Sequence, residues 1–248
     1  MLRQAILHVS MAVILAATAG FAADADALVK QLNGMNLSDP ASIGGVEKII
    51  AENGDAGGLY LLKSVLHVKH GETLAGMNCL RIAVNCQLIV DGPILKFTRE
   101  KLDEYIKESQ DKNLDHELGG LLVIRSVALL VAKDMQSAMA DLNLAEQKFP
   151  RLPEVYNTRG ICRHVLGDEK NALEDYDKAI QLNPNYADAF GNRAGLYKRM
   201  GDDEHAKRDR IRYVMLLNRL YGMSAGELNA DDESPPPESK NASGAGKK

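Results

Sequence analysis

The chain has 248 residues, of which 45% are hydrophobic and 26% are charged, as is ordinary for a globular protein of one or two domains. Its formal net charge of -4 argues against nucleic-acid binding, because phosphate recognition needs a concentrated basic surface. Aromatic residues make up 5% and Trp is absent, which favours helices packed through small side chains over a β-sandwich. We therefore expect an all-α fold.

The first residues of the chain, 1–22, have the pattern of a secretory signal peptide. Arg3 supplies a positive start, residues 5–19 are almost wholly apolar, and small residues lead up to Ala22. The apolar run is shorter than the roughly 20 residues that span a bilayer, so an uncleaved anchor is the less favoured alternative. The sequence predicts cleavage after Ala22 and a periplasmic or secreted protein.

Residues 23–118 are predicted to form an N-terminal helical region. Apolar residues at helical spacing indicate a short helix over 41–53, then a helical hairpin over 56–90. Asp91-Gly92-Pro93 reads as a break, and a charged amphipathic helix is expected over 98–113. The segment 57–90 is either a degenerate copy of the repeat described below or a chance likeness between two amphipathic hairpins.

Three cysteines and two histidines raise the question of a disulfide or a metal site. Cys79 and Cys86 are the candidate pair, but on one continuous helix they would lie roughly 10 Å apart, so a bridge requires a break between them. Cys162 is expected to be a small buried side chain. His67 and His70 share one face of a predicted helix and could hold a metal with either cysteine. The plainer interpretation, a helix end and a surface position, predicts no metal and no cofactor.

From residue 119 the sequence repeats with a period of 34 residues, which defines units 119–152, 153–186 and 187–220. Small residues recur at positions where the two helices of a pair would approach closely, and large side chains recur at positions where one pair would stack on the next. The dipeptides Gly167-Asp168 and Gly201-Asp202 each supply a residue that ends the first helix and an N-cap for the second. The residues expected to pack the repeat are Ser126, Ala138, Ala145, Tyr156, Gly160, Ala172, Tyr176, Ala179, Pro184, Phe190, Ala194 and Ala206. This pattern predicts an α-solenoid of antiparallel helix pairs with a concave side lined by the first helix of each pair.

The middle unit resembles the tetratricopeptide-repeat family. The likeness rests on Tyr156-Asn-Thr-Arg-Gly160, Leu166-Gly167-Asp168, Ala172, Tyr176, Ala179 and Asn183-Pro184. The third unit departs at Arg210, Tyr213 and Asn218, so its second helix is expected to be a terminal cap. In the first unit, the helix over 121–132 is apolar nearly all round and is expected to be covered by the N-terminal helices.

Counting around the first helices predicts a peptide-binding groove that changes from apolar to basic. Its expected lining is Val127 and Val131, then Asn157, Ile161 and His164, then Asn192, Gly195, Lys198 and Arg199. Asparagine side chains can hydrogen-bond the backbone amides of an extended peptide, and Lys198 with Arg199 could bind an acidic group of the peptide. The alternative is that these two cations only solvate the end of the array. Glu174, Asp175 and Asp177 are expected on a solvated outer face.

No phosphate-binding glycine loop, nucleophile motif, zinc motif or Cys-x-x-Cys occurs in the sequence, so neither an enzyme nor a small-molecule substrate is expected. The favoured function is an exported scaffold or adaptor that binds a protein or peptide partner in cell-envelope assembly or in complex formation. The alternatives are a structural, self-associating subunit of an envelope complex and, less favoured, a metal- or redox-active protein. Residues 223–248 are rich in Asp, Pro, Ser, Gly and Lys, and they are expected to be a disordered tail.

Overall fold

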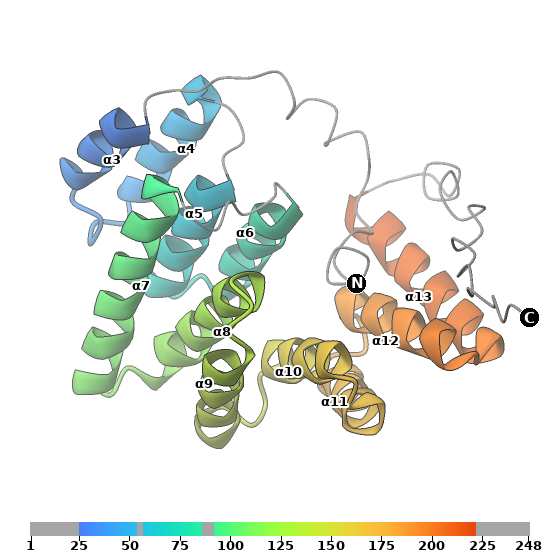
Figure 1. The fold of residues 1–248 in the computed structure, drawn as a ribbon. Coiled ribbons are helices and arrows are strands. Elements are labelled where there is room, and N and C mark those ends of the chain that lie inside the picture. The colour runs from blue at the N-terminus through green and yellow to red at the C-terminus, as the bar shows by residue number, and fades with distance from the viewer. Residues whose placement is uncertain (1–24, 54–56, 86–91, 222–248) are drawn as a thin grey trace, which may run out of the picture.

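The computed structural model describes residues 25–53, 57–85 and 92–221, and these ranges contain eleven helices and no strand (Figure 1). The helices before the predicted array are α3 (Ala25–Asn33), α4 (Ser42–Asn53), α5 (Gly57–Lys69), α6 (Thr73–Asn85) and α7 (Pro93–Asp111). Those that follow are α8 (Asp115–Val131), α9 (Met135–Lys148), α10 (Pro153–Leu166), α11 (Glu169–Leu182), α12 (Ala187–Met200) and α13 (Asp203–Tyr221). The predicted all-α class is confirmed. None of these helices is long and apolar enough to cross a bilayer.

The N-terminal helices share one hydrophobic core with the start of the array. Buried side chains form a single cluster that runs from Leu28 in α3 to Cys162 in α10, without interruption at residue 118. Helix α8 packs against α5, α6 and α7 as well as its own partner α9. This covering explains why α8 is apolar nearly all round, as expected.

The prediction for 91–113 needs correction, because α7 begins at Pro93 and not at residue 98. Proline is accommodated in the first turn of a helix, where its missing N–H would have no intrahelical partner. Pro93 therefore opens the helix and does not lie in a break before it.

Helices α5 and α6 approach one another as the later pairs do. Ser64 Oγ donates a hydrogen bond to the Gly76 carbonyl at 2.7 Å, and Ser126 Oγ donates one to the Ala138 carbonyl at 3.4 Å, with the same spacing of twelve residues. The hairpin α5–α6 therefore has the close small-residue contact of a repeat unit. Residues 86–90 of the possible degenerate repeat lie outside the described residues, as do Cys86, the predicted signal peptide and the predicted tail.

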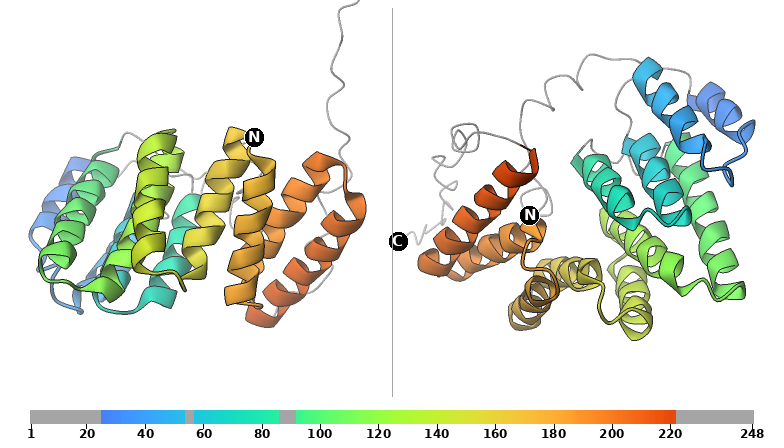
Figure 2. Two further views of the ribbon diagram at one scale, coloured as in Figure 1. Left: turned by 90° about the horizontal axis from the view of Figure 1, so that it is seen from below. Right: turned by 180° about the vertical axis from the view of Figure 1, so that it is seen from behind.

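Three helix pairs, α8–α9, α10–α11 and α12–α13, stand side by side along a curved array (Figure 2). The first helices pack on one another, α8 on α10 and α10 on α12, while α9 and α11 each also contact the first helix of the next unit. The array therefore has a continuous face made of first helices, which we call the first-helix face.

The turns inside the pairs follow the predicted chemistry. Gly167 and Gly201 have φ of +83° and +80°, the left-handed conformation that glycine adopts without steric cost. In the first unit Lys133 occupies this position with φ of +63°. Each aspartate that follows caps the second helix, since Asp168 accepts a hydrogen bond from the Asn171 amide and Asp202 accepts one from the His205 amide.

Close packing at Gly160 shows why a small residue occupies the centre of a pair. A Cβ added there would lie 2.6 Å from Cε1 of Tyr176, which is fully buried. The other packing residues named from the sequence are also buried, except Pro184, which is exposed. Glycine at 160 therefore makes room for the tyrosine ring across the pair.

Candidate functional site

A column of arginine–aspartate pairs joins the two helices of every unit. The pairs are Arg125 with Asp141, Arg159 with Asp175 and Arg193 with Asp209, at shortest distances of 2.6, 2.8 and 2.7 Å. The arginines are 34 residues apart and each aspartate lies 16 residues later, on the second helix of its unit. All three aspartates are buried, with exposed fractions of 7%, 3% and 4%. The same charged contact between the two helices of a unit, which we call a joint, therefore occurs three times.

Each of these arginines also reaches back to the preceding helix layer. Arg125 contacts Asp103 of α7 and Arg193 contacts Asp177 of α11, while the guanidinium of Arg159 meets both carboxylate oxygens of Glu146 on α9. The arginine column thus ties a unit together and fastens it to its neighbour.

The expectation of a solvated acidic outer face is wrong for Asp175. Its carboxylate is held by Arg159 and by Arg163, whose Nη1 lies 2.6 Å from Oδ2. Burial raises the pKa of Asp175, and the hydrogen bonds from Arg159 oppose that rise. Glu174 is exposed as expected, and Asp177 is exposed but paired with Arg193. The missed signal was the recurrence of arginine and aspartate at the 34-residue shift.

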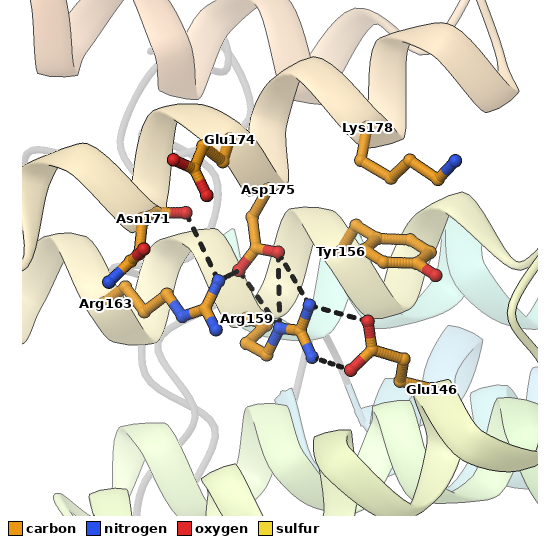
Figure 3. A pocket seen from close by; sticks show the side chains of 8 residues that line it. All are labelled: Glu146, Tyr156, Arg159, Arg163, Asn171, Glu174, Asp175 and Lys178. Atoms are coloured by element: carbon orange, nitrogen blue, oxygen red, sulfur yellow. Dashed lines mark hydrogen bonds and ion pairs between the residues drawn. The ribbon is translucent and has the colours of Figure 1, made fainter.

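Figure 3 shows the cleft that surrounds the middle joint. It has a volume of about 440 Å3, and its lining is Glu146, Tyr156, Arg159, Arg163, Asn171, Glu174, Asp175 and Lys178. Three cationic and three anionic side chains balance one another, and the central ones are bonded to each other. A second cleft, of about 430 Å3, surrounds Arg125 and Asp141 in the same way. Both clefts are therefore charge-balanced joints between units.

The first-helix face carries the predicted asparagines, and they meet across units. Asn192 Nδ2 donates a 2.9 Å hydrogen bond to Asn157 Oδ1, and Asn157 Nδ2 lies 3.5 Å from the Tyr186 hydroxyl. Asn157 is only 5% exposed, whereas Asn192 is half-buried. The structure therefore links α10 to α12 through an amide pair, with Asn192 as its more accessible member.

The aliphatic part of the predicted groove is half-buried. Val127, Val131 and Ile161 all pack partly against the main core. Gly195 on α12 is exposed, and a Cβ added to it would meet no described atom within 4 Å. The most open part of the first-helix face is thus on the third unit.

The cations of the predicted groove lie at the C-terminal ends of the first helices. Arg199 contacts Glu169 at 3.0 Å and donates to the His164 carbonyl at 3.2 Å, so it links the second and third units. Lys198 is exposed and His164 is half-buried. Burial and the charge of Arg199 lower the pKa of His164, so this imidazole is neutral at pH 7.

Two acidic residues at the opposite ends of these helices were missed from the sequence. Glu154 and Asp188 occupy equivalent positions in the first turns of α10 and α12, and both are half-buried. Oε2 of Glu154 is buried with no hydrogen-bond partner among the described residues, and burial raises the pKa of this carboxyl group. The face is therefore acidic at the helix starts and basic at the helix ends. The predicted change from apolar to basic along the array describes only part of it.

Among the residues considered for metal or redox chemistry, His67 bonds to a carboxylate, whereas Nε2 of His70 is buried with no hydrogen-bond partner among the described residues. His67 Nδ1 lies 2.6 Å from a carboxylate oxygen of Glu72, and Cys79 and Cys162 are buried free thiols. Within the described ranges, no three potential metal ligands gather.

Comparison with known proteins places the repeat in a family. Residues 153–186, which form α10 and α11, match the model of the tetratricopeptide repeat. The middle unit of the chain is a tetratricopeptide repeat. The matched range contains the Gly160–Tyr176 contact and the Arg159–Asp175 joint. No curated protein matches the chain closely enough to count as a relative.

Several solved structures are similar to the chain at low sequence identity and low TM-score. BtubC (BKLC) from P. vanneervenii is 14% identical, with a TM-score of 0.45 over 91% of this chain and 100% of that one. MamA is 13% identical, with a TM-score of 0.41 over 82% and 100% of the two chains. YrrB, described as a TPR protein with an unusual peptide-binding site, is 18% identical, with a TM-score of 0.38 over 72% and 98%. Likenesses this weak carry no argument about function.

The repeats support a role as a protein-interaction scaffold. Tetratricopeptide-repeat proteins bind protein or peptide partners and are generally scaffolds without enzymatic activity.

Proposed function

We propose that this protein is an exported adaptor that holds an extended segment of a partner polypeptide against the first-helix face. The observation that carries the proposal is the continuity of that face, where α8, α10 and α12 pack in succession and Asn157 and Asn192 are hydrogen-bonded across units. Open space in front of Gly195 leaves room for a ligand beside the amide pair.

The polar groups of the face suit a peptide that carries both charges. Asp188 and Lys198 lie ten residues apart on α12, which corresponds to roughly 15 Å along a helix. About five residues of extended chain cover that distance. A basic group near Glu154 and Asp188, with an acidic group or C-terminal carboxylate near Lys198, would complement the two ends, while Asn192 bonds the peptide backbone.

The site of action is proposed to be the cell envelope, either in assembly or in complex formation, because residues 1–22 have the composition of a signal peptide. Cell fractionation followed by mass spectrometry of the N-terminus tests this. We expect a mature chain that begins at Ala23 in the periplasmic or secreted fraction. An intact Met1 on protein from the cytosolic fraction would refute export.

Affinity capture from the native envelope tests the binding face. The variant Lys198→Glu/Arg199→Glu reverses two exposed charges on α12, and the matched control Lys148→Glu/Arg151→Glu reverses two exposed charges near the end of α9. We expect the first variant to lose the partner and the control to retain it. The first variant also loses the contact of Arg199 with Glu169 and should melt at a lower temperature, so circular dichroism must show that both variants are folded at the temperature of capture. Equal recovery by both variants would contradict the proposal.

A further inference from the structure

The outer face of the last helix, α13, exposes two large apolar side chains. Ile211 is 53% exposed and Met215 is 58% exposed, and they stand one helical turn apart. On the same helix, Tyr213, Leu216 and Leu217 are buried against the rest of the unit. The exposed pair is thus separate from the stacking core.

Comparison with the other units shows that this exposure is a departure from the repeat. The equivalent positions, 34 and 68 residues earlier, hold Asp177 and Gln181 on α11 and Asn143 and Gln147 on α9. All four of those side chains are exposed and polar. The apolar pair therefore occupies positions that are polar and exposed in the other two units, where Asp177 also pairs with Arg193 of the next unit.

Exposed cations border this ridge on both sides. At 100° per residue, Lys207 lies on one side of Ile211 and Met215, while Arg208, Arg212 and Arg219 lie on the other. We call these six residues the α13 patch. The pair of Arg208 with Glu204 has side chains 66% and 81% exposed, so it leaves the guanidinium accessible.

We propose that the α13 patch docks an acidic amphipathic helix of a partner polypeptide. Side chains four residues apart form a ridge that fits the groove of a second helix, which suits the pair Ile211 and Met215. Carboxylates flanking an apolar stripe on the partner would meet the bordering cations. This surface lies on a second helix of the array, so the proposal stands independently of peptide binding at the first-helix face.

The geometry favours such a helix over two other occupants. A lipid bilayer requires a broad apolar face, but among the α13 side chains that the structure describes only two large apolar ones project here, because Tyr213, Leu216 and Leu217 hold α13 against α12. Antiparallel pairing with a second copy, with Ile211 against Met215, would place Lys207 opposite Arg219 and bring like charges together.

Binding of a defined probe to the full chain tests the proposal. The probe is a synthetic amphipathic helical peptide with a leucine stripe flanked by glutamates, and its counterpart carries lysines in place of the glutamates. The variant Ile211→Asn/Met215→Gln installs the residues that the first unit has at these positions. The matched control, Leu166→Gln/Met200→Gln, removes two apolar residues of 60% and 45% exposure at the ends of first helices.

We expect the wild-type chain and the control to bind the glutamate peptide about tenfold more tightly than the lysine peptide. Ile211→Asn/Met215→Gln should weaken binding on the order of tenfold, and Lys207→Glu/Arg208→Glu should remove the preference for glutamate. Equal binding by all chains would overturn the proposal. Binding to anionic vesicles and not to the peptide would also overturn it. A dimer detected by light scattering that Ile211→Asn/Met215→Gln converts to monomer would overturn it as well, as would peptide binding that appears only after residues 222–248 are removed.

Discussion

The arginine column can be tested at its middle joint by replacing Arg159 with alanine. The Asp175 carboxylate accepts three hydrogen bonds from Arg159 and one from Arg163, and Asp175 is 3% exposed. Breaking a buried ion pair by removing one partner costs about 3–5 kcal/mol, since the remaining charge is left uncompensated. Because Arg163 keeps its contact, we expect Arg159→Ala to lower the free energy of unfolding by about 3 kcal/mol, at the low end of that range.

Urea unfolding followed by circular dichroism measures this cost. The matched control is Arg208→Ala, whose ion pair with Glu204 is largely exposed and should contribute at most about 1 kcal/mol. The double variant Arg159→Met/Asp175→Leu removes both charges and should be more stable than Arg159→Ala. A cost for Arg159→Ala no larger than that of Arg208→Ala would refute the assignment of the column as a stabilising joint.

The cost of Arg159→Ala should also depend on pH. Burial raises the folded-state pKa of Asp175 above its unfolded value, and loss of the Arg159 hydrogen bonds raises it further. A carboxyl group with a raised folded pKa binds more protons in the folded state than in the unfolded state, so stability increases as the pH falls toward that pKa. The deficit of the variant should therefore shrink as the pH falls from neutral toward that raised pKa.

Three further predictions concern single sites. Hydrogen bonds from Lys112 and Lys69 lower the pKa of Glu108 to about 2, so the stability that the ionised carboxylate contributes is present above its ordinary pKa of 4.5 and is lost as the pH falls from 4.5 toward 2. In Glu108→Gln, the urea midpoint should therefore fall less steeply over that pH range than in the wild type. An equally steep fall in both proteins would contradict this. Burial raises the pKa of Cys162 to about 12, so iodoacetamide should modify it only after unfolding, as peptide mass spectrometry would show. Gly160→Ala should lower the melting temperature, because the added Cβ would press on Tyr176 at a cost of about 1–3 kcal/mol. Gly195→Ala places its Cβ in open space and should stabilise α12 by about 0.5–1 kcal/mol. Similar shifts of the melting temperature in both variants would refute the packing argument.

The repeat architecture could be predicted from the sequence because its signals are local and periodic. Gly167 and Gly201 mark turns through their backbone freedom, and Gly160 follows from the ring that faces it across the pair. The helix boundary predicted from Pro93 was less secure, since a proline can either break a helix or open one, and here it opens α7.

The chemistry of the surfaces was harder to predict, because it depends on which helix faces which. Asp175 looked like a surface acid until its partner Arg159 was placed on the facing helix. Glu154 and Asp188 were overlooked because single acids in a first turn are ordinary for any helix. The apolar pair on α13 is visible in the sequence only when the three units are compared position by position.

Site-specific photo-crosslinking tests most directly whether the first-helix face binds a polypeptide. A photoreactive residue at Gly195 on α12 is compared with one at exposed Glu174 on the second helix α11. We predict that a partner polypeptide is crosslinked from position 195 and not from position 174. Crosslinks from 174 alone, or equal crosslinks from both positions, would contradict binding at the first-helix face.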